Sequence, residues 1–238
     1  MGRRKASICP GTIRAPVEIV EGQAKAGYAA PVANSRKVPA MADAIDFYFD
    51  FSSPYGYLAS TAIEAIAARH GRPVRWRPFL IGALYKQLGY TPLEQPGKRA
   101  YFLHDVPRSA RAMGVTLTFP PSFPEALIAP ARAVYWIADR DPAKAGAFAA
   151  AAFRAYWAEG RKLADPEIVA EIAAAQGFAK EEVLAALADQ AVKDRLKAET
   201  DAAIAAGIFG SPFIVIDGEK FWGSDRLDQV EKWLAGGW

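Results

Sequence analysis

The stretch Phe49-Asp50-Phe51-Ser52-Ser53-Pro54-Tyr55-Gly56-Tyr57 decides the fold, because it ends a strand and begins a helix. The apolar run from Ile45 to Phe51 predicts the strand, and residues 54–69 predict the helix. Serine caps a first helical turn well and proline suits the first helical position, so the Ser53-Pro54 pair is a common helix start. Unpartnered backbone N–H groups at such a start favour an anion. Ser53 is therefore either a simple N-cap or part of a site for an anionic group.

A second string, near the C-terminal end, offers the other half of such a site. Gly210-Ser211-Pro212-Phe213 precedes an apolar strand that we expect over residues 213–216. A cis peptide bond before proline costs only about 0.5–1 kcal/mol, although Gly-Ser-Pro alone would also suit an ordinary turn. Asp217-Gly218 then predicts a tight turn, and residues 220–222 predict the returning strand of a hairpin.

The last helix is expected to begin at Gly223-Ser224-Asp225-Arg226, immediately after the hairpin. Capping is the simple role for Ser224 and Asp225, with Arg226 as a solvated residue of the first turn. The carboxylate of Asp50, in the first string, has two open roles. It is either a buried partner of the turn or an edge-facing strand carboxylate.

The paired strings resemble the thioredoxin-like fold, in particular the branch of the 2-hydroxychromene-2-carboxylate isomerases and the kappa-class glutathione transferases. The likeness covers most of the chain after Asp43. In redox members of this fold the turn carries Cys-x-x-Cys, whereas the matching residues here read Ser53-Pro54-Tyr55-Gly56. Disulfide exchange at this turn is excluded, since the single cysteine, Cys9, lies in a distant segment. The resemblance implies that the thiol arrives with a ligand, and that this ligand is glutathione.

The resemblance also implies a role for each half of the site. Ser53 would donate a hydrogen bond to the glutathione sulfur and favour its thiolate. The backbone of Ser211, before a cis-proline, would hold the tripeptide. Asp225 would meet the γ-glutamyl ammonium group, while Ser224 and the helix N-terminus would meet its carboxylate. The implied glutathione-binding residues are Ser53, Ser211, Pro212, Ser224, Asp225 and Arg226.

The order of the predicted elements indicates an α/β protein, a thioredoxin-like domain with a large inserted all-helical domain. A strand over residues 74–79 is followed by Ala-rich text with helical patterning that lasts to Gly207. The expected helices are 95–113, 125–139, 142–157, 166–176, 180–188 and 190–206. Pro107 and Pro130 are expected to kink or interrupt two of them. The expected domains are a flexible extension over 1–42, a thioredoxin-like domain over 43–82 and 207–238, and a helical insertion over 83–206.

The inserted helices would cover the Ser53 turn and form a pocket for a second, more apolar substrate. By resemblance, Lys86, Tyr90 and Arg132 are the candidate substrate-binding residues, and the lysine would attract a carboxylate. Pocket lining and ordinary helix packing are alternative roles for Tyr101, Phe102, Tyr135 and Trp136. The sequence departs from the family pattern at Tyr90, where asparagine is common, and at Ala126-Leu127, where Asn-Ser is expected. These departures leave the substrate open.

Composition narrows the class of protein. With 238 residues and 52% hydrophobic content the chain can bury a large core, and no apolar run approaches the roughly 20 residues of a membrane span. The absence of such a run predicts no membrane association. A single cysteine gives no disulfide framework, which agrees with the cytoplasmic location that we expect. His70 and His104 stand apart, which argues against a metal site.

The positive charge of the chain is concentrated at its start. Residues 1–40 carry seven basic and two acidic side chains, so the net charge of +3 becomes about −2 for the remainder. Nucleic-acid binding is therefore not expected. Translation from Met41 or an organellar transit peptide would each explain such an extension.

The resemblance implies a glutathione-dependent cis–trans isomerase. Its substrate would be 2-hydroxychromene-2-carboxylate or a related intermediate of aromatic catabolism, and it would act by reversible thiolate addition. A homodimer is expected from the family. Two alternatives stay open, a kappa-like glutathione transferase, in which thiolate addition ends the reaction, and a non-catalytic module that binds thiol ligands.

Overall fold

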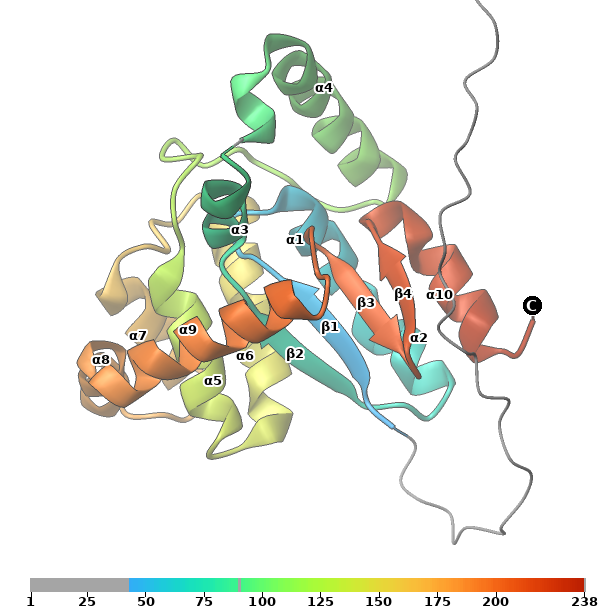
Figure 1. Cartoon of the computed structure of the whole chain (residues 1–238). Helices are drawn as coiled ribbons and strands as arrows, with labels where there is room; N and C mark the ends of the chain where they lie inside the picture. Colours follow the sequence, from blue (N-terminus) through green and yellow to red (C-terminus); the bar gives the residue numbers. More distant parts are fainter. Residues whose placement is uncertain (1–42, 90, 238) are drawn as a thin grey trace, which may run out of the picture. The chain divides into compact units, whose positions relative to one another are not determined.

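A four-stranded mixed sheet organises the chain in the computed structural model, which describes residues 43–89 and 91–237 (Figure 1). The strand order is β2-β1-β3-β4. Strand β1 (Ile45–Phe49) is parallel to β2 (Val74–Pro78) and antiparallel to β3 (Phe213–Ile216), which pairs antiparallel with β4 (Glu219–Trp222). The predicted strands are therefore confirmed, although β1 ends two residues earlier than expected. The predicted extension, Cys9, Met41 and the candidate Tyr90 lie outside the described residues.

Strand β1 is an inner strand of the sheet and, apart from Asp46, its residues are buried and apolar or aromatic on both faces. Phe47 and Phe49 pack into the larger core, where Phe47 meets Trp76 edge-on with ring centroids 5.0 Å apart. Tyr48 points to the opposite face and packs with Phe79 and Phe213. Helix α9 covers this second face, as its position across the strands in Figure 1 shows. A strand buried on both faces fixes where its end, and hence the Ser53 turn, lies.

Helices fill the sequence between β2 and β3, as the fold class predicts. They are α3 (Ile81–Leu88), η1 (Pro92–Glu94), α4 (Pro96–Ala112), α5 (Ile128–Ala138), α6 (Pro142–Trp157), α7 (Pro166–Ala174), α8 (Lys180–Ala188) and α9 (Gln190–Ala205). Before this block lie α1 (Pro54–Ser60) and α2 (Ile63–Arg69), and after the sheet lie η2 (Ser224–Arg226) and α10 (Leu227–Leu234). The boundary of the insertion, and its status as a domain, stay predictions.

Three details of the helices differ from the sequence-based expectation. The predicted helix over 54–69 is broken, because the Thr61 hydroxyl donates to the Leu58 carbonyl (2.7 Å) and competes with the helical backbone. Helix α4 continues through Pro107 without interruption. Pro130 does not break a helix either, because α5 begins at Ile128 and leaves Pro130 in the first turn, where no backbone donor is required.

Helix α3 was not predicted, and its start depends on residues far away in sequence. The Leu80 N–H donates to Thr200 Oγ1 (3.2 Å), and the Ile81 N–H donates to Asp50 Oδ2 (2.8 Å). These two acceptors cap the helix in place of a local serine or aspartate. Because the capping acceptors come from Asp50 after β1 and from Thr200 of α9, the sequence around Leu80 contains no capping residue that would mark the start of α3.

Helix α6 packs against β2 through a glycine, which gives a testable contrast. A Cβ on Gly146 would lie 2.6 Å from Trp76 Nε1 and 2.9 Å from Glu64 Oε1, two atoms that already share a 2.6 Å hydrogen bond. Gly146→Ala is therefore expected to lower the free energy of unfolding by about 1–2 kcal/mol, since overpacking outweighs the gain in helix propensity.

The matched control is Gly97→Ala in α4, where a Cβ meets nothing within 4 Å. This variant is expected to gain a few tenths of a kcal/mol or more from helix propensity. Urea unfolding of both variants measures the difference, and equal effects would contradict the close contact at Gly146.

Candidate active site

Ser53 caps helix α1 and is at the same time bonded to the distant cis-proline loop. Its Oγ accepts from the Gly56 N–H (3.1 Å), which satisfies one of the open donors of the first turn. The same hydroxyl donates to the backbone carbonyl of Ser211 (2.8 Å). The predicted cap is therefore present, and the two strings of the sequence meet at this one oxygen.

The loop before β3 is held tightly against the Ser53 turn. The Ser211–Pro212 peptide bond is cis, as predicted, and the Ser211 hydroxyl accepts from the Asp50 N–H (2.9 Å). Gly56 permits this approach, because a Cβ there would lie 2.9 Å from Ser211 Oγ. Position 56, the fourth residue of the Ser53-Pro54-Tyr55-Gly56 turn, therefore has no room for a side chain while the Ser211 hydroxyl keeps its present position. A pair of cysteines would not fit here without moving Ser211.

Asp50 takes the first of its two open roles, since its side chain is buried beneath the turn. Oδ1 accepts from the Ser52 N–H (2.8 Å) and from the Ser52 hydroxyl (2.7 Å), and Oδ2 accepts from the Ile81 N–H (2.8 Å). Burial raises the pKa of the Asp50 carboxyl above its usual value, and the bonds from Ser52 and Ile81 oppose this rise. One carboxyl thus joins the end of β1, the Ser53 turn and the start of α3.

The third string, Ser224-Asp225-Arg226, lies beside the other two. The Gly223 N–H donates to the Pro212 carbonyl (3.1 Å), and the short helix η2 that follows lies against α1. The Asp225 and Arg226 side chains are exposed and form an ion pair at 3.1 Å. The described structure therefore brings the three strings that carry the implied glutathione-binding residues together beside α1, and the roles of these residues stay predictions.

The described candidate substrate-binding residues, Lys86 and Arg132, lie on two different helices, α3 and α5. Lys86 is exposed on α3. Arg132 is half-buried on α5 and donates from Nη1 to the Leu187 carbonyl (3.2 Å), while its buried Nε finds no partner in the described part of the chain. Burial lowers the pKa of Arg132. The roles of Lys86 and Arg132 in substrate binding stay predictions.

Two of the aromatic candidates take part in helix packing away from the Ser53 turn. The buried Tyr135 hydroxyl donates to the Pro78 carbonyl (2.7 Å), and Trp136 packs edge-on against Phe178. Both rings also line a surface hollow of about 570 Å³ between α5 and α9, with guanidinium groups over them at 5.3 Å (Arg195) and 3.9 Å (Arg140). The residues predicted to bind glutathione, and Lys86 and Arg132, do not line this hollow.

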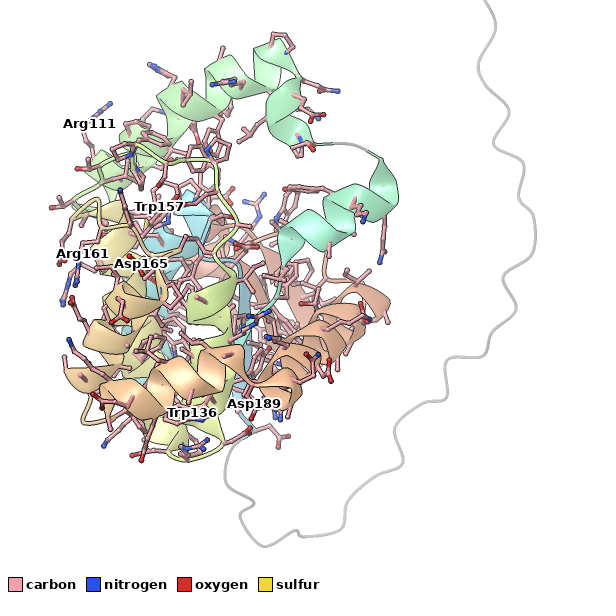
Figure 2. The ribbon with its side chains drawn as sticks, turned by 90° about the vertical axis from the view of Figure 1, so that its left-hand side faces the viewer. Arg111, Trp136, Trp157, Arg161, Asp165 and Asp189 are labelled. Carbon is pink, nitrogen blue, oxygen red and sulfur yellow. The ribbon has the colours of Figure 1, made fainter. Side chains whose placement is uncertain are left out.

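Sequence reasoning missed two contacts that hold the Ser53 turn from its helical side. Trp157, in the interior below α4 (Figure 2), donates from Nε1 to the Phe51 carbonyl (2.9 Å). The Tyr55 hydroxyl donates to Asp105 Oδ2 of α4 (2.7 Å). Phe51 and Tyr55 stand two residues before and two residues after Ser53. The helices between β2 and β3 therefore fix both flanks of the turn.

Comparison with known proteins identifies the fold. The sequence model of the DSBA-like thioredoxin domain matches residues 44–235. The chain belongs to this family. It is 32% identical over 197 residues to 2-hydroxychromene-2-carboxylate isomerase of Sphingobium xenophagum, a match that covers 82% of this chain and 99% of the relative. The predicted thioredoxin-like fold and the predicted family branch are thereby confirmed.

Two further members of the DSBA-like family show the same relationship. Glutathione S-transferase kappa 2 of Caenorhabditis elegans is 28% identical over 205 residues, which covers 80% of this chain and 91% of the relative. A solved structure of a 2-hydroxychromene-2-carboxylate isomerase superposes with a TM-score of 0.73 at 27% identity, covering 81% of this chain and 94% of that one. These relatives support an enzyme of the isomerase type with a glutathione-related chemistry.

Neither a metal-binding cluster nor a membrane-spanning helix is found among the residues that the structure describes. No group of three or more His, Cys, Asp or Glu side chains there is placed to hold a metal ion. No helix within residues 43–89 and 91–237 is long and apolar enough to cross a membrane.

Proposed function

We propose that this protein is a glutathione-dependent cis–trans isomerase acting on 2-hydroxychromene-2-carboxylate or a related aromatic carboxylate. The observation that carries the proposal is the bond between the Ser53 hydroxyl and the Ser211 carbonyl at the start of α1. It sets a hydroxyl beside a cis-proline loop at a turn that has no cysteine. A site of this kind needs a thiol from outside.

The residues present fit glutathione by their chemistry. The Ser211 carbonyl has two lone pairs and accepts from Ser53 with one, so the other is able to accept from a peptide N–H. The exposed Asp225 carboxylate offers an acceptor for an ammonium group, and Ser224 offers a hydroxyl for a carboxylate. These groups complement a zwitterionic tripeptide with a central peptide backbone.

When bound, glutathione would supply a thiolate that adds reversibly to a conjugated carbon of the substrate, so that a double bond becomes a rotatable single bond and the thiol is then released unchanged. The hydroxyl proton of Ser53 must turn from the Ser211 carbonyl toward the incoming sulfur. Ser53 keeps its bond from the Gly56 N–H during this rotation and stays in place. A bond to a charged acceptor is about twice as strong as a neutral one, which favours the rotation.

Three further residues hold the turn in place. Asp50 fixes the Ser52 backbone, and Trp157 and Asp105 fix the flanks at Phe51 and Tyr55. Lys86 and Arg132 are proposed to contact the substrate. A homodimer and a cytoplasmic location complete the proposal, and sedimentation equilibrium checks the first of these.

The test is calorimetric titration of glutathione into the wild-type protein, followed by incubation with 2-hydroxychromene-2-carboxylate while free thiol is measured. Isomerisation with constant free thiol supports the proposal. Consumption of thiol with stoichiometric conjugate would assign the kappa-like transferase activity instead. Glutathione binding without turnover of chromene carboxylates or general electrophiles would assign the binding module, and no glutathione binding at all would exclude both enzyme activities.

A further inference from the structure

One carboxylate on α4 gathers two tyrosine hydroxyls and a guanidinium beside the Ser53 turn. Asp105 Oδ2 accepts from the Tyr55 hydroxyl (2.7 Å), and Oδ1 accepts from the Tyr101 hydroxyl (3.1 Å) and from Arg108 Nη2. The Asp105 side chain is only 14% exposed, whereas that of Arg108 is 52% exposed. Burial alone would raise the pKa of Asp105, but the bonds from Tyr55, Arg108 and Tyr101 outweigh it and hold the pKa below its usual value. The cluster is therefore fixed at the mostly buried Asp105 carboxylate, while Arg108 remains accessible to solvent.

The two tyrosine rings form an aromatic wall next to the turn. Tyr55 stands two residues after Ser53, and its ring meets Phe102 of α4 edge-on with centroids 5.9 Å apart. Tyr101 is 60% exposed although it is aromatic. Because both hydroxyls bind the same carboxylate, the two rings converge on one point. A planar aromatic ligand carried on a thiol at Ser53 would meet this wall first.

Arg108 adds a specific polar group to the wall. Its Nη2 is used by Asp105 and by the Tyr101 hydroxyl (3.3 Å), and its guanidinium lies 5.8 Å from the centre of the Tyr101 ring. Nε and Nη1 donate no hydrogen bond to any residue that the structure describes. An arginine held in place from one side presents its remaining N–H groups to a carboxylate at little cost in side-chain entropy.

We propose that Tyr55, Tyr101 and Arg108 form the subsite for the aromatic carboxylate substrate. The tyrosine rings contact the aromatic ring of the substrate, and the Arg108 guanidinium binds its carboxylate. Asp105 is a positioning residue, because it acts only through the other three. The inference rests on the proposed function and names where its second substrate binds.

The test uses two glutathione conjugates that differ by one charge, S-benzylglutathione and S-(4-carboxybenzyl)glutathione. The ratio of their dissociation constants, from calorimetry, measures the preference for the carboxylate. Wild-type protein is expected to prefer the carboxylated conjugate about tenfold, the size of one hydrogen-bonded charge pair. Arg108→Gln is expected to reduce this ratio to about one while binding of S-benzylglutathione changes little.

Arg111→Gln is the matched control, since Arg111 lies one turn further along α4 and is exposed at its surface (Figure 2). It changes the net charge equally and is expected to keep the preference. Asp105→Asn distinguishes positioning from simple electrostatics. Removal of a negative charge next to Arg108 would by itself strengthen the preference, whereas loss of the positioning contact is expected to weaken it. Tyr101→Ala is expected to weaken the binding of both conjugates by the same factor, which leaves the ratio of their dissociation constants unchanged.

The outcomes separate this inference from the proposed function. If neither glutathione nor either conjugate binds the wild-type protein, the proposed function fails and the subsite fails with it. If the conjugates bind but Arg108→Gln keeps the wild-type ratio, or if Lys86→Gln abolishes the preference instead, the subsite inference is overturned and the proposed function stands.

Discussion

Ser53→Ala is expected to lower isomerase turnover about 100-fold while the dissociation constant of glutathione changes less than about threefold. The hydroxyl contributes most when the sulfur carries a full negative charge, and a hydrogen bond to a charged group is worth up to about 3 kcal/mol. Under the proposed function, glutathione binding depends on the Ser211 backbone and on the Ser224 and Asp225 side chains. The substitution removes the bond from Ser53 to the Ser211 carbonyl. The bonds from the Asp50 N–H to the Ser211 hydroxyl and from the Gly223 N–H to the Pro212 carbonyl still hold this loop. Steady-state kinetics and calorimetry on the same preparation measure both quantities.

Loss of the cap must be separated from loss of the chemistry, because Ser53 also accepts from the Gly56 N–H. Removal of an N-cap costs about 1 kcal/mol of stability by itself. Asp165→Ala is the matched control, since Asp165 caps α7 through the Glu167 N–H (3.0 Å) and is not a predicted site residue. This control is expected to lose similar stability and no activity. Full turnover in Ser53→Ala, or an equal loss in Asp165→Ala, would contradict the proposed role.

Asp50→Ala is expected to lower the free energy of unfolding by about 3 kcal/mol, the largest stability effect among these predictions. The substitution leaves the Ser52 and Ile81 N–H groups without their acceptor under the turn. A part-buried N–H that loses its partner costs about 1–3 kcal/mol, and these costs are not fully additive. Urea unfolding measures the loss, with Asp189→Ala as control, because the exposed Asp189 carboxylate accepts a single described hydrogen bond, from the Ala191 N–H. Equal losses in the two variants would refute a special role for Asp50.

Asp50 also predicts a sign for the dependence of stability on pH. Since burial raises its pKa in the folded state, the folded chain holds this proton more tightly than the unfolded chain does. The stability contributed by the protonated carboxyl is complete below the unfolded pKa and is lost as pH rises through the folded pKa. The destabilisation caused by Asp50→Asn is therefore expected to shrink as pH is raised from acidic to neutral.

Asp217 gives the opposite sign and serves as the internal comparison. Hydrogen bonds from Arg72 (2.7 and 3.0 Å) hold the pKa of Asp217 below its usual value. The stability that the ionised Asp217 contributes is present above the pKa of Asp217 in the unfolded chain, and it is lost as pH falls through the pKa of Asp217 in the folded chain. Asp217→Asn is therefore expected to destabilise more at neutral pH than in acid. Parallel pH profiles for the two asparagine variants would contradict both assignments.

Much of the fold follows from local signals. Helices α6 and α8 begin and end where their patterns predict, because Asp141-Pro142 and the apolar spacing mark their limits within the local sequence. The strand pair β3–β4 follows in the same way from a two-residue turn between apolar runs. Helix α3 could not be predicted from local signals, since the acceptors for the N–H groups at its start belong to Asp50 and Thr200, which are 31 and 120 residues away.

The candidate site likewise has a part that was predicted from the sequence and a part that was not. The two strings were predicted to meet, and the hydrogen bond from Ser53 to the Ser211 carbonyl confirms their contact. The supports from Trp157 and Asp105 were missed, because each acts on a residue 50 or more positions away and local sequence patterns carry no information on such contacts. An acidic residue at one helical spacing from both a tyrosine and an arginine, as in Tyr101, Asp105 and Arg108, is the one signal that could have pointed to the cluster.

The close contact between Gly56 and Ser211 limits how this site could be changed by design. Ser53→Cys alone would introduce one thiol and no disulfide partner. A second cysteine at position 56 would push against Ser211 Oγ and break its bond from the Asp50 N–H. A design that introduces dithiol chemistry at this turn must therefore also accommodate Ser211, either by moving its hydroxyl or by replacing it. The lack of room at this glycine thus opposes a dithiol site, in addition to the absence of cysteine from the turn.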